Sequence, residues 1–248
     1  MHFGIFANDG LFALALFIVA GAFFIRGVIG FGSGLIAVSL MIFFLPIKFV
    51  VPLIFILDTL ASAALGSYDY KEIRWKEVIW LLPFASLGVL AGGYILKNVS
   101  AQKVTAILGA FILLYVLYTL LVKLDKYPPI AKKWAVPLGF LGGLAGSLYG
   151  GGGPPLVAYL QMRHLTKRHF RATMQVIAIL NNLMRGVMYL FIGFLTWRIF
   201  TTSLWLLPAM VAGLWFGNRI HLAISAKKFQ QATLIVLTLA GIKLLLPS

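Results

Sequence analysis

The sequence predicts an all-α polytopic membrane protein. Of its 248 residues, 61% are apolar and only 11% are charged, and the mean hydropathy is +0.99. A soluble globular domain carries about 25% charged residues. Apolar runs of about 17 to 25 residues are long enough to cross a bilayer, and the polar connections between them are too short to form a soluble domain. The chain is therefore expected to cross the membrane repeatedly.

Six apolar runs are long enough to predict full crossings. They cover residues 48–66, 77–96, 104–122, 172–192, 199–218 and 229–246. The N-terminus has no basic residue before its first apolar run and no small-residue cleavage site after it, so a removable signal peptide is not predicted.

The net charge of +15 does not indicate a nucleic-acid-binding protein. The basic residues lie in short loops between apolar runs, a distribution that orients a membrane protein in the bilayer. The chain has no cysteine, no P-loop lysine and no dinucleotide-binding fingerprint. Three of its four histidines lie in basic loops. Neither a metal site nor a cofactor is expected.

The two halves of the chain resemble each other. Residues of the same type recur 125 positions apart, at Trp80 and Trp205, Pro83 and Pro208, Gly88 and Gly213, Gly92 and Gly217, Ser100 and Ser225, and Lys103 and Lys228. We therefore predict two transmembrane repeats, 1–124 and 132–248, joined by a cytoplasmic linker at 125–131. The paired glycines have the GxxxG spacing that lets helices approach closely in lipid.

Each half opens with two short apolar pieces around a glycine cluster, "RGVIGFGSG" in the first half and "YGGGGPPL" in the second. Glycine disfavours a continuous helix, and proline is tolerated only where a helix begins. One helix is therefore predicted to end at the glycines and another to start after them. At 1.5 Å per residue the pieces reach about 14 to 23 Å, too short to cross alone. The four pieces are 11–25, 33–45, 134–148 and 154–162.

Each pair is either a broken helix that crosses once or a re-entrant hairpin that returns to its own side. The hairpin puts 14 Lys and Arg residues in loops on one side and 5 on the other, whereas single crossings divide the same residues 9 against 10. Two full crossings per pair would give the same count as the hairpin, but the second pieces are too short. The positive-inside rule favours the hairpin, with both termini outside and the repeats inverted. The basic loops, predicted to be cytoplasmic, are 67–76, 123–133, 163–171 and 219–228.

Inverted repeats with interrupted helices are the architecture of secondary transporters. With its two glycine motifs, one per half, the chain resembles the sulfite exporter TauE/SafE family over nearly its whole length. The resemblance implies transport of sulfite, thiosulfate or an organosulfonate across the inner (plasma) membrane without an ATP-binding subunit. Family members read glycine-glycine where this chain has Gly32 and Ser33.

Three ionisable residues stand out in the predicted membrane interior: Arg26, Asp58 and Arg185. A charge at the centre of a membrane helix costs about 2.5 to 3.5 kcal/mol, so each one needs a partner or a wet cavity. Asp58 either pairs with an arginine and locks helices together or carries a proton. Whichever arginine it pairs with, one positive charge is left for an anionic substrate. Arg185 is favoured over Arg26, which lies at a helix end and is free to cap carbonyls there.

The predicted substrate site lies between the repeats, where free N–H groups at the starts of the second pieces favour an anion. Its residues are Arg26, Gly30, Gly32, Ser33, Gly34, Gly151, Gly152, Gly153, Pro154, Asn181, Asn182 and Arg185, with Asp58 as the coupling residue. Potential-driven export is favoured, and a proton-coupled importer or a passive anion channel are the alternatives. An intramembrane hydrolase using Ser33 is disfavoured because "GFGSG" lacks the G-x-S-x-G spacing. The expected partners are the anion and the lipid bilayer, and the oligomeric state stays open, a homodimer included.

Overall fold

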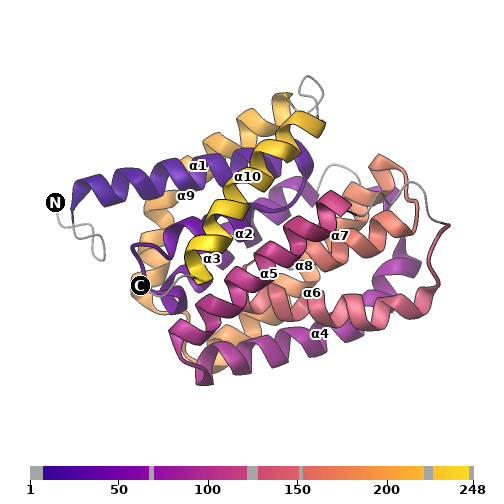
Figure 1. The fold of residues 1–248 in the computed structure, drawn as a ribbon, viewed down its shortest axis with the longest axis horizontal. Coiled ribbons are helices and arrows are strands. Elements are labelled where there is room, and N and C mark those ends of the chain that lie inside the picture. The colour runs from indigo at the N-terminus through magenta and orange to yellow at the C-terminus, as the bar shows by residue number, and fades with distance from the viewer. Residues whose placement is uncertain (1–7, 67–69, 122–127, 151–152, 221–225, 246–248) are drawn as a thin grey trace.

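The computed structural model describes residues 8–66, 70–121, 128–150, 153–220 and 226–245. Within these ranges all regular structure is helical (Figure 1), which confirms the predicted fold class. The helices are α1 (Asp9–Ile29), α2 (Ser33–Met41), α3 (Ile47–Gly66), α4 (Trp75–Asn98), α5 (Ala101–Leu121), α6 (Ala135–Tyr149), α7 (Gly153–Met162), α8 (Lys167–Phe191), α9 (Trp197–Ile220) and α10 (Ala226–Leu245), with short 3-10 turns at η1 (Tyr70–Glu72) and η3 (Lys132–Trp134).

Six helices among the described residues are long and apolar enough to cross a membrane: α1, α3, α4, α5, α8 and α9. Five of the six predicted crossings correspond to these helices. The sixth, 229–246, coincides with the 20-residue helix α10 up to Leu245, and residue 246 lies outside the described residues.

The expectation that the first apolar piece is too short to cross is wrong. Helix α1 has 21 residues, about 31 Å at 1.5 Å per residue. It starts earlier than predicted because the Asn8 side chain accepts a hydrogen bond from the Leu11 N–H at 2.8 Å. It continues through Arg26 because this charge has a buried partner, and it ends only at Gly30.

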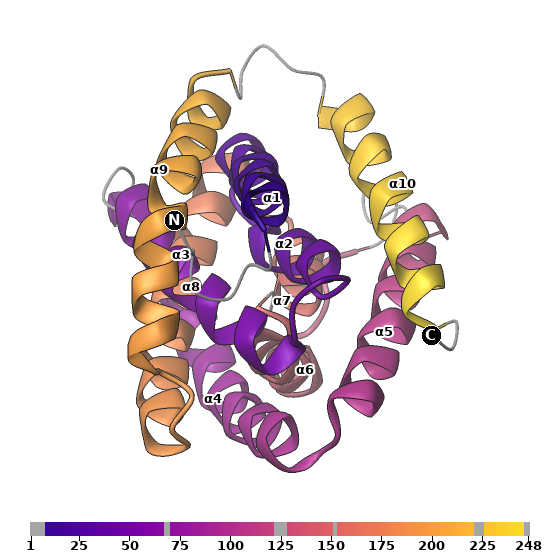
Figure 2. The ribbon, with the colours of Figure 1, turned by 90° about the vertical axis from the view of Figure 1, so that its left-hand side faces the viewer.

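Both predicted helix breaks lie at the glycine clusters. Gly30 and Gly32 have φ angles of 90° and 94°, and Gly150 has a φ of 72°, all in the left-handed region that glycine adopts without strain. Helix α7 then begins at Gly153 with two prolines in its first turn, where their missing N–H groups cost nothing. Figure 2, which looks roughly along α1, shows α2 displaced to one side of α1 rather than in line behind it.

The two breaks touch each other at the centre of the molecule. A Cβ atom placed on Gly34, in the first turn of α2, would overlap the carbonyl oxygen of Gly150. The same Cβ would lie 3.0 Å from Asp58 Oδ2 on α3. Only glycine at position 34 allows this contact between the halves.

The GxxxG glycines bring together helices from different halves. On α4, Gly88 lies against the Phe140 carbonyl of α6, and on α9 Gly213 lies against the Ala20 carbonyl of α1. In both places an added Cβ would overlap the carbonyl oxygen. Helix α4 therefore packs along α6 and α9 along α1, as Figure 1 shows, so each opening helix is held by the other half. This agrees with the predicted packing role of these glycines.

Three of the four basic loops are tied together at one end of the molecule. His169 Nε2 lies 3.0 Å from Glu72 Oε2, and Arg163 Nη1 donates to the Ile130 carbonyl at 2.6 Å. At the opposite end Lys48 Nζ donates to the Lys97 carbonyl at 3.0 Å. A single crossing of each pair would put 163–171 on the side opposite 67–76 and 123–133, so these contacts argue against single crossings. The inversion of the repeats and the cytoplasmic location of the basic end stay predictions.

A buried carboxylate that the sequence analysis did not single out stabilises this basic end. Glu77, in the first turn of α4, accepts hydrogen bonds from the Tyr159 hydroxyl at 2.7 Å and from Arg163 Nε and Nη2 at 3.1 Å each. Arg163 also donates to the Ile130 carbonyl at 2.6 Å. The end of α7 is thereby fixed to α4 and to the segment that enters α6.

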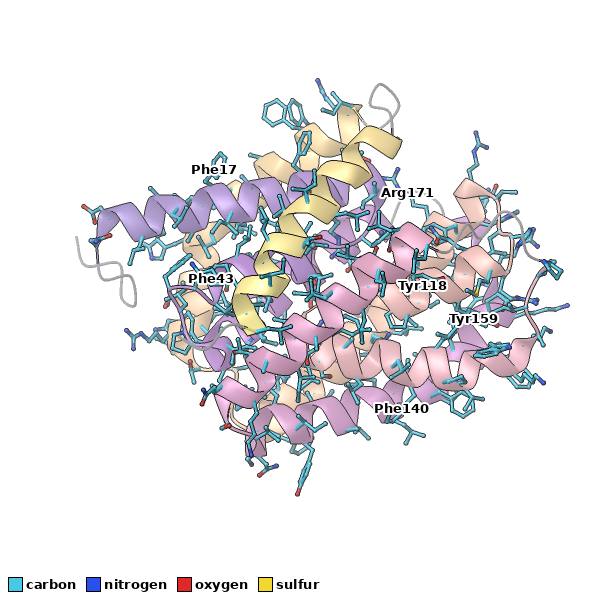
Figure 3. All side chains as sticks on the ribbon, viewed as in Figure 1. Phe17, Phe43, Tyr118, Phe140, Tyr159 and Arg171 are labelled. Atoms are coloured by element: carbon cyan, nitrogen blue, oxygen red, sulfur yellow. The ribbon has the colours of Figure 1, made fainter. Side chains whose placement is uncertain are left out.

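Large apolar side chains cover the outer surface of the long helices. Phe17 on α1 is 78% exposed, and Phe140 on α6 also points away from the helix bundle (Figure 3). A soluble monomer rarely exposes an apolar patch larger than a few hundred Å². The outer face is therefore suited to contact lipid.

We expect Gly88→Ala to destabilise the protein strongly, because the added methyl group would have to separate α4 from α6. Overpacking of this kind typically costs about 1 to 3 kcal/mol. The control is Gly21→Ala on α1, where a Cβ meets nothing within 4 Å and helix propensity favours alanine. Thermal melting in detergent compares them, and an unchanged melting temperature for Gly88→Ala would contradict the close-packing account.

The charge asymmetry predicts that the basic end is cytoplasmic. In this cysteine-free chain, Arg168→Cys and Ser100→Cys place single thiols at exposed positions on the basic and the opposite side. A membrane-impermeant thiol reagent applied to intact cells is expected to label the Ser100 variant and to spare the Arg168 variant until the cells are opened. The reverse pattern would invert the topology.

Candidate functional site

A cavity of about 60 Å³ lies where the two helix breaks meet. Its wall comes from both glycine clusters, from α3, α4 and α6, and from one face of α8. On α8 the lining residues recur every three or four positions, at Met174, Ala178, Asn181, Asn182 and Arg185. Arg185 lies eleven positions after Met174, so this face follows the cavity for about 16 Å.

Arg26 and Asp58 form a buried ion pair in the wall of this cavity. Arg26 Nη1 lies 2.7 Å from Asp58 Oδ1, and both side chains are almost fully buried. Ser33 joins the pair, since its hydroxyl accepts from Arg26 Nη1 at 3.0 Å and donates to Asp58 Oδ1 at 2.6 Å. Arg26 Nη2 donates to Ser62 Oγ at 2.6 Å. The suggested role of Arg26 in capping carbonyls is wrong, because Arg26 Nη1 and Nη2 donate to these side chains.

Arg185 has no such compensation. It is only 3% exposed, and no acidic side chain of the described residues pairs with it. Its Nη1 donates to Asn182 Oδ1 at 2.9 Å, while Nε and Nη2 have no hydrogen-bond partner. These two nitrogens share one edge of the planar guanidinium, the edge that binds two oxygens of an oxyanion side by side.

Aromatic rings hold the Arg185 guanidinium in place. Its central carbon lies 5.1 Å from the centre of the Phe55 ring and 5.6 Å from that of Tyr189, within the range of cation–π attraction. The Tyr189 hydroxyl is itself fixed by donating to the Ser147 carbonyl at 2.7 Å. The cation is thus positioned before any ligand arrives.

Helix N-termini add positive potential to the same cavity. Ser33 and Gly34 are the first two residues of α2, and Gly153 is the first residue of α7. The first N–H groups of a helix have no partner within the helix and favour an anion. Pro154 and Pro155 have no N–H, so α2 presents more donors than α7 does.

The structure brings most of the predicted site residues to one cavity. Arg26, Gly30, Gly32, Ser33, Gly34, Asp58, Gly153, Asn181, Asn182 and Arg185 all line it. Pro154 is buried in the first turn of α7 but does not line the cavity. Gly151 and Gly152 lie outside the described residues. Binding by any of these residues stays a prediction.

Sequence analysis missed several contributors to the site. Ser62, which binds Arg26, lies one helical turn after Asp58, a spacing that could have revealed it. Gly142, Gly143 and Gly146 of α6 also line the cavity, but glycines in an apolar helix carry no signal that separates a cavity wall from close packing.

The fold and the site together define a multi-pass helical membrane protein with a charged central cavity, the general design of a membrane transporter. The model of the sulfite exporter TauE/SafE family matches residues 13–244, and the chain belongs to this family. A curated relative is the probable inner membrane transporter protein TsaS of Comamonas testosteroni, 26% identical over 197 residues that cover 77% of this chain and 81% of TsaS. No solved structure gives a significant match.

We expect Asp58→Asn to destabilise the protein, because it leaves the buried Arg26 charge unpaired. Breaking a buried pair by removing one partner costs about 3 to 5 kcal/mol. The double variant Arg26→Gln/Asp58→Asn should recover much of this loss, since it removes both charges. Thermal melting of the two single variants and the double variant measures the coupling, and strictly additive losses would argue against the pair.

Proposed function

We propose that this protein is a secondary transporter that carries a small sulfur oxyanion through the central cavity, with Arg185 as the main binding residue. The observation that carries the proposal is that Arg185 lines the cavity between the two helix breaks while its buried Nε and Nη2 have no hydrogen-bond partner. An arginine side chain stays charged in a protein. An uncompensated charge in the membrane interior is costly, and a bound anion would compensate it.

The surroundings of Arg185 support an anionic substrate. The other buried arginine of the cavity is neutralised by Asp58, so the cavity keeps a net positive charge. The start of α2 adds N–H groups and the positive end of a helix dipole. Asn181 and Asn182 supply polar groups along the same face of α8.

The size of the cavity supports a small substrate. Its volume of about 60 Å³ exceeds the roughly 10 to 15 Å³ that one water needs, and it is far below the several hundred Å³ of sites for drug-sized ligands. Sulfite, thiosulfate and short organosulfonates have the required charge and paired oxygens.

Export driven by the membrane potential is the proposed direction. A negative interior favours exit of an anion by about 2.3 kcal/mol per charge per 100 mV. In this scheme the basic loops face the cytoplasm of the inner membrane. Asp58 Oδ1 already accepts hydrogen bonds from Arg26 and Ser33, which supports a structural role for this carboxylate over the role of proton carrier.

Two alternatives make different demands on the protein. An importer has to work against the potential, so it would couple to protons, with Asp58 as the natural carrier. A passive channel would use the same positive cavity without alternating access. Flux in proteoliposomes separates these mechanisms: saturation and counterflow indicate a carrier, a requirement for a pH gradient indicates the importer, and linear conductance indicates a pore.

We expect Arg185→Gln to weaken anion binding more than tenfold, because hydrogen bonds to a charged group contribute about 1.5 to 3 kcal/mol each. Titration calorimetry of purified protein with sulfite, thiosulfate and methanesulfonate measures the affinity. The matched control is Arg219→Gln, which removes an equal charge from an exposed residue stacked on Trp215 at 4.0 Å.

The control variant should bind like the parent. If the Arg185 variant is produced poorly while its surviving protein binds normally, Arg185 only locks helices together. The proposed anion site would then be wrong.

A further inference from the structure

Phe31 occupies an unusual position in the wall of the cavity. It is the single residue between Gly30 and Gly32, both in the left-handed region at φ 90° and 94°. It lines the cavity as the only large side chain of the first helix break.

The Phe31 ring contacts the basic end of the molecule. Its centroid lies 6.2 Å from that of Phe170, with the ring planes at 71°, and Phe170 is in the first turns of α8 next to the basic loop 163–171. A Cβ on Gly153 would lie 3.4 Å from Phe31 Cδ2, so the ring also covers the start of α7.

The surroundings of Phe31 on this side are apolar. Phe31 and Phe170 pack on a cluster that includes Leu156 and Met174, and both of these also line the cavity. The polar residues of α8, from Asn181 to Arg185, lie deeper, about 10 to 16 Å further along the helix than Met174. An ion leaving the polar part of the cavity toward the basic loops therefore meets an apolar constriction.

Phe31 is also the part of this constriction that is best able to move. Glycine adopts left-handed and right-handed backbone conformations with similar ease. The Gly30 carbonyl accepts a hydrogen bond from Gln175 Nε2 at 2.6 Å, so Gly32 is the freer pivot beside the ring. A Cβ on Gly32 would meet nothing within 4 Å, which leaves open space beside the pivot. The neighbouring end of α7, in contrast, is fixed by Glu77 through Tyr159 and Arg163.

We propose that Phe31 is the gate that closes the central cavity on the side of the basic loops. An apolar constriction blocks ions because it loses its water, and an ion inside it would lack hydration. Rotation of Phe31 about its flanking glycines would open the cavity to that side alone. In the predicted repeat, Gly151 occupies the position equivalent to Phe31, 120 residues on, so the sequence provides this aromatic on only one side. The gate rests on the proposed function only for the identity of the ion that passes.

The test measures the reactivity of one thiol in the cavity. Ala178→Cys places it on the lining face of α8 in a chain that has no other cysteine. The probes are the anionic reagent 2-sulfonatoethyl methanethiosulfonate and the neutral methyl methanethiosulfonate. The anionic reagent does not cross the bilayer, so it is applied to membrane vesicles of both orientations to give the rate from each face. The neutral reagent crosses the bilayer and reports the overall reactivity of the thiol. Arg168→Cys in a separate preparation identifies the face that carries the basic loops.

Adding Phe31→Ala is expected to raise the modification rate from the basic-loop face about tenfold and to leave the rate from the opposite face unchanged. Phe31→Leu should give a smaller rise, and it keeps the test available if the alanine variant does not fold. The matched control is Phe17→Ala on α1, an exposed aromatic that should change neither rate. Melting temperatures show that the variants compared are folded.

Unchanged rates from the basic-loop face, or equal rises from both faces, would overturn the gate. The two reagents separate this result from the anion site. An anion site predicts a higher ratio of the anionic to the neutral modification rate in Ala178→Cys than in Arg168→Cys. If both reagents react faster when Phe31→Ala is added but this higher ratio is absent, the gate stands and the proposed anion site fails.

Discussion

The contact between Gly34 and Gly150 is the constraint on which the rest of the structure depends. It brings the interrupted helices of the two halves within backbone contact at the centre, where any side chain at position 34 would separate them. Non-helical backbone is tolerated within a membrane only where protein or a wet cavity surrounds it. The helix breaks of the opening pairs can therefore lie inside the bundle. Helix α9 of the second half packs on α1, and helix α4 of the first half packs on α6.

The electrostatics of the centre follow from this packing. Three ionisable side chains are buried around the breaks, and only two of them neutralise each other, through the 2.7 Å contact of Arg26 and Asp58. Two serines add hydrogen bonds to that pair, which makes it a support for the joint between α1, α2 and α3. The third charge, Arg185, keeps one edge of its guanidinium free. Geometry thus separates a paired arginine from an unpaired one within one cavity.

The two ends of the molecule are built differently. At the basic end, Glu77 joins α4, α7 and the segment before α6, and an apolar cluster lies between this ion pair and the cavity. At the opposite end the described contacts are lighter, such as Lys48 with the Lys97 carbonyl and Lys243 over the Phe43 ring at 4.4 Å. The two ends of the bundle therefore differ in the side chains that hold them together, although the two halves of the sequence resemble each other.

The sequence by itself determined the fold class, the helix breaks and the family, because these depend on local properties. Run length, glycine and proline position, and loop charge act within a few residues and leave a readable pattern. The sequence also singled out Asp58 and the two arginines as buried charges, although it stopped α1 too early by treating Arg26 as an end. Only the tertiary structure decided which arginine pairs with Asp58, since α1, α3 and α8 meet through packing between distant segments. The tertiary structure alone also decided the burial of Glu77 and the contact of Phe31 with Phe170. A contact across the bundle has no signature in the sequence on either side of it.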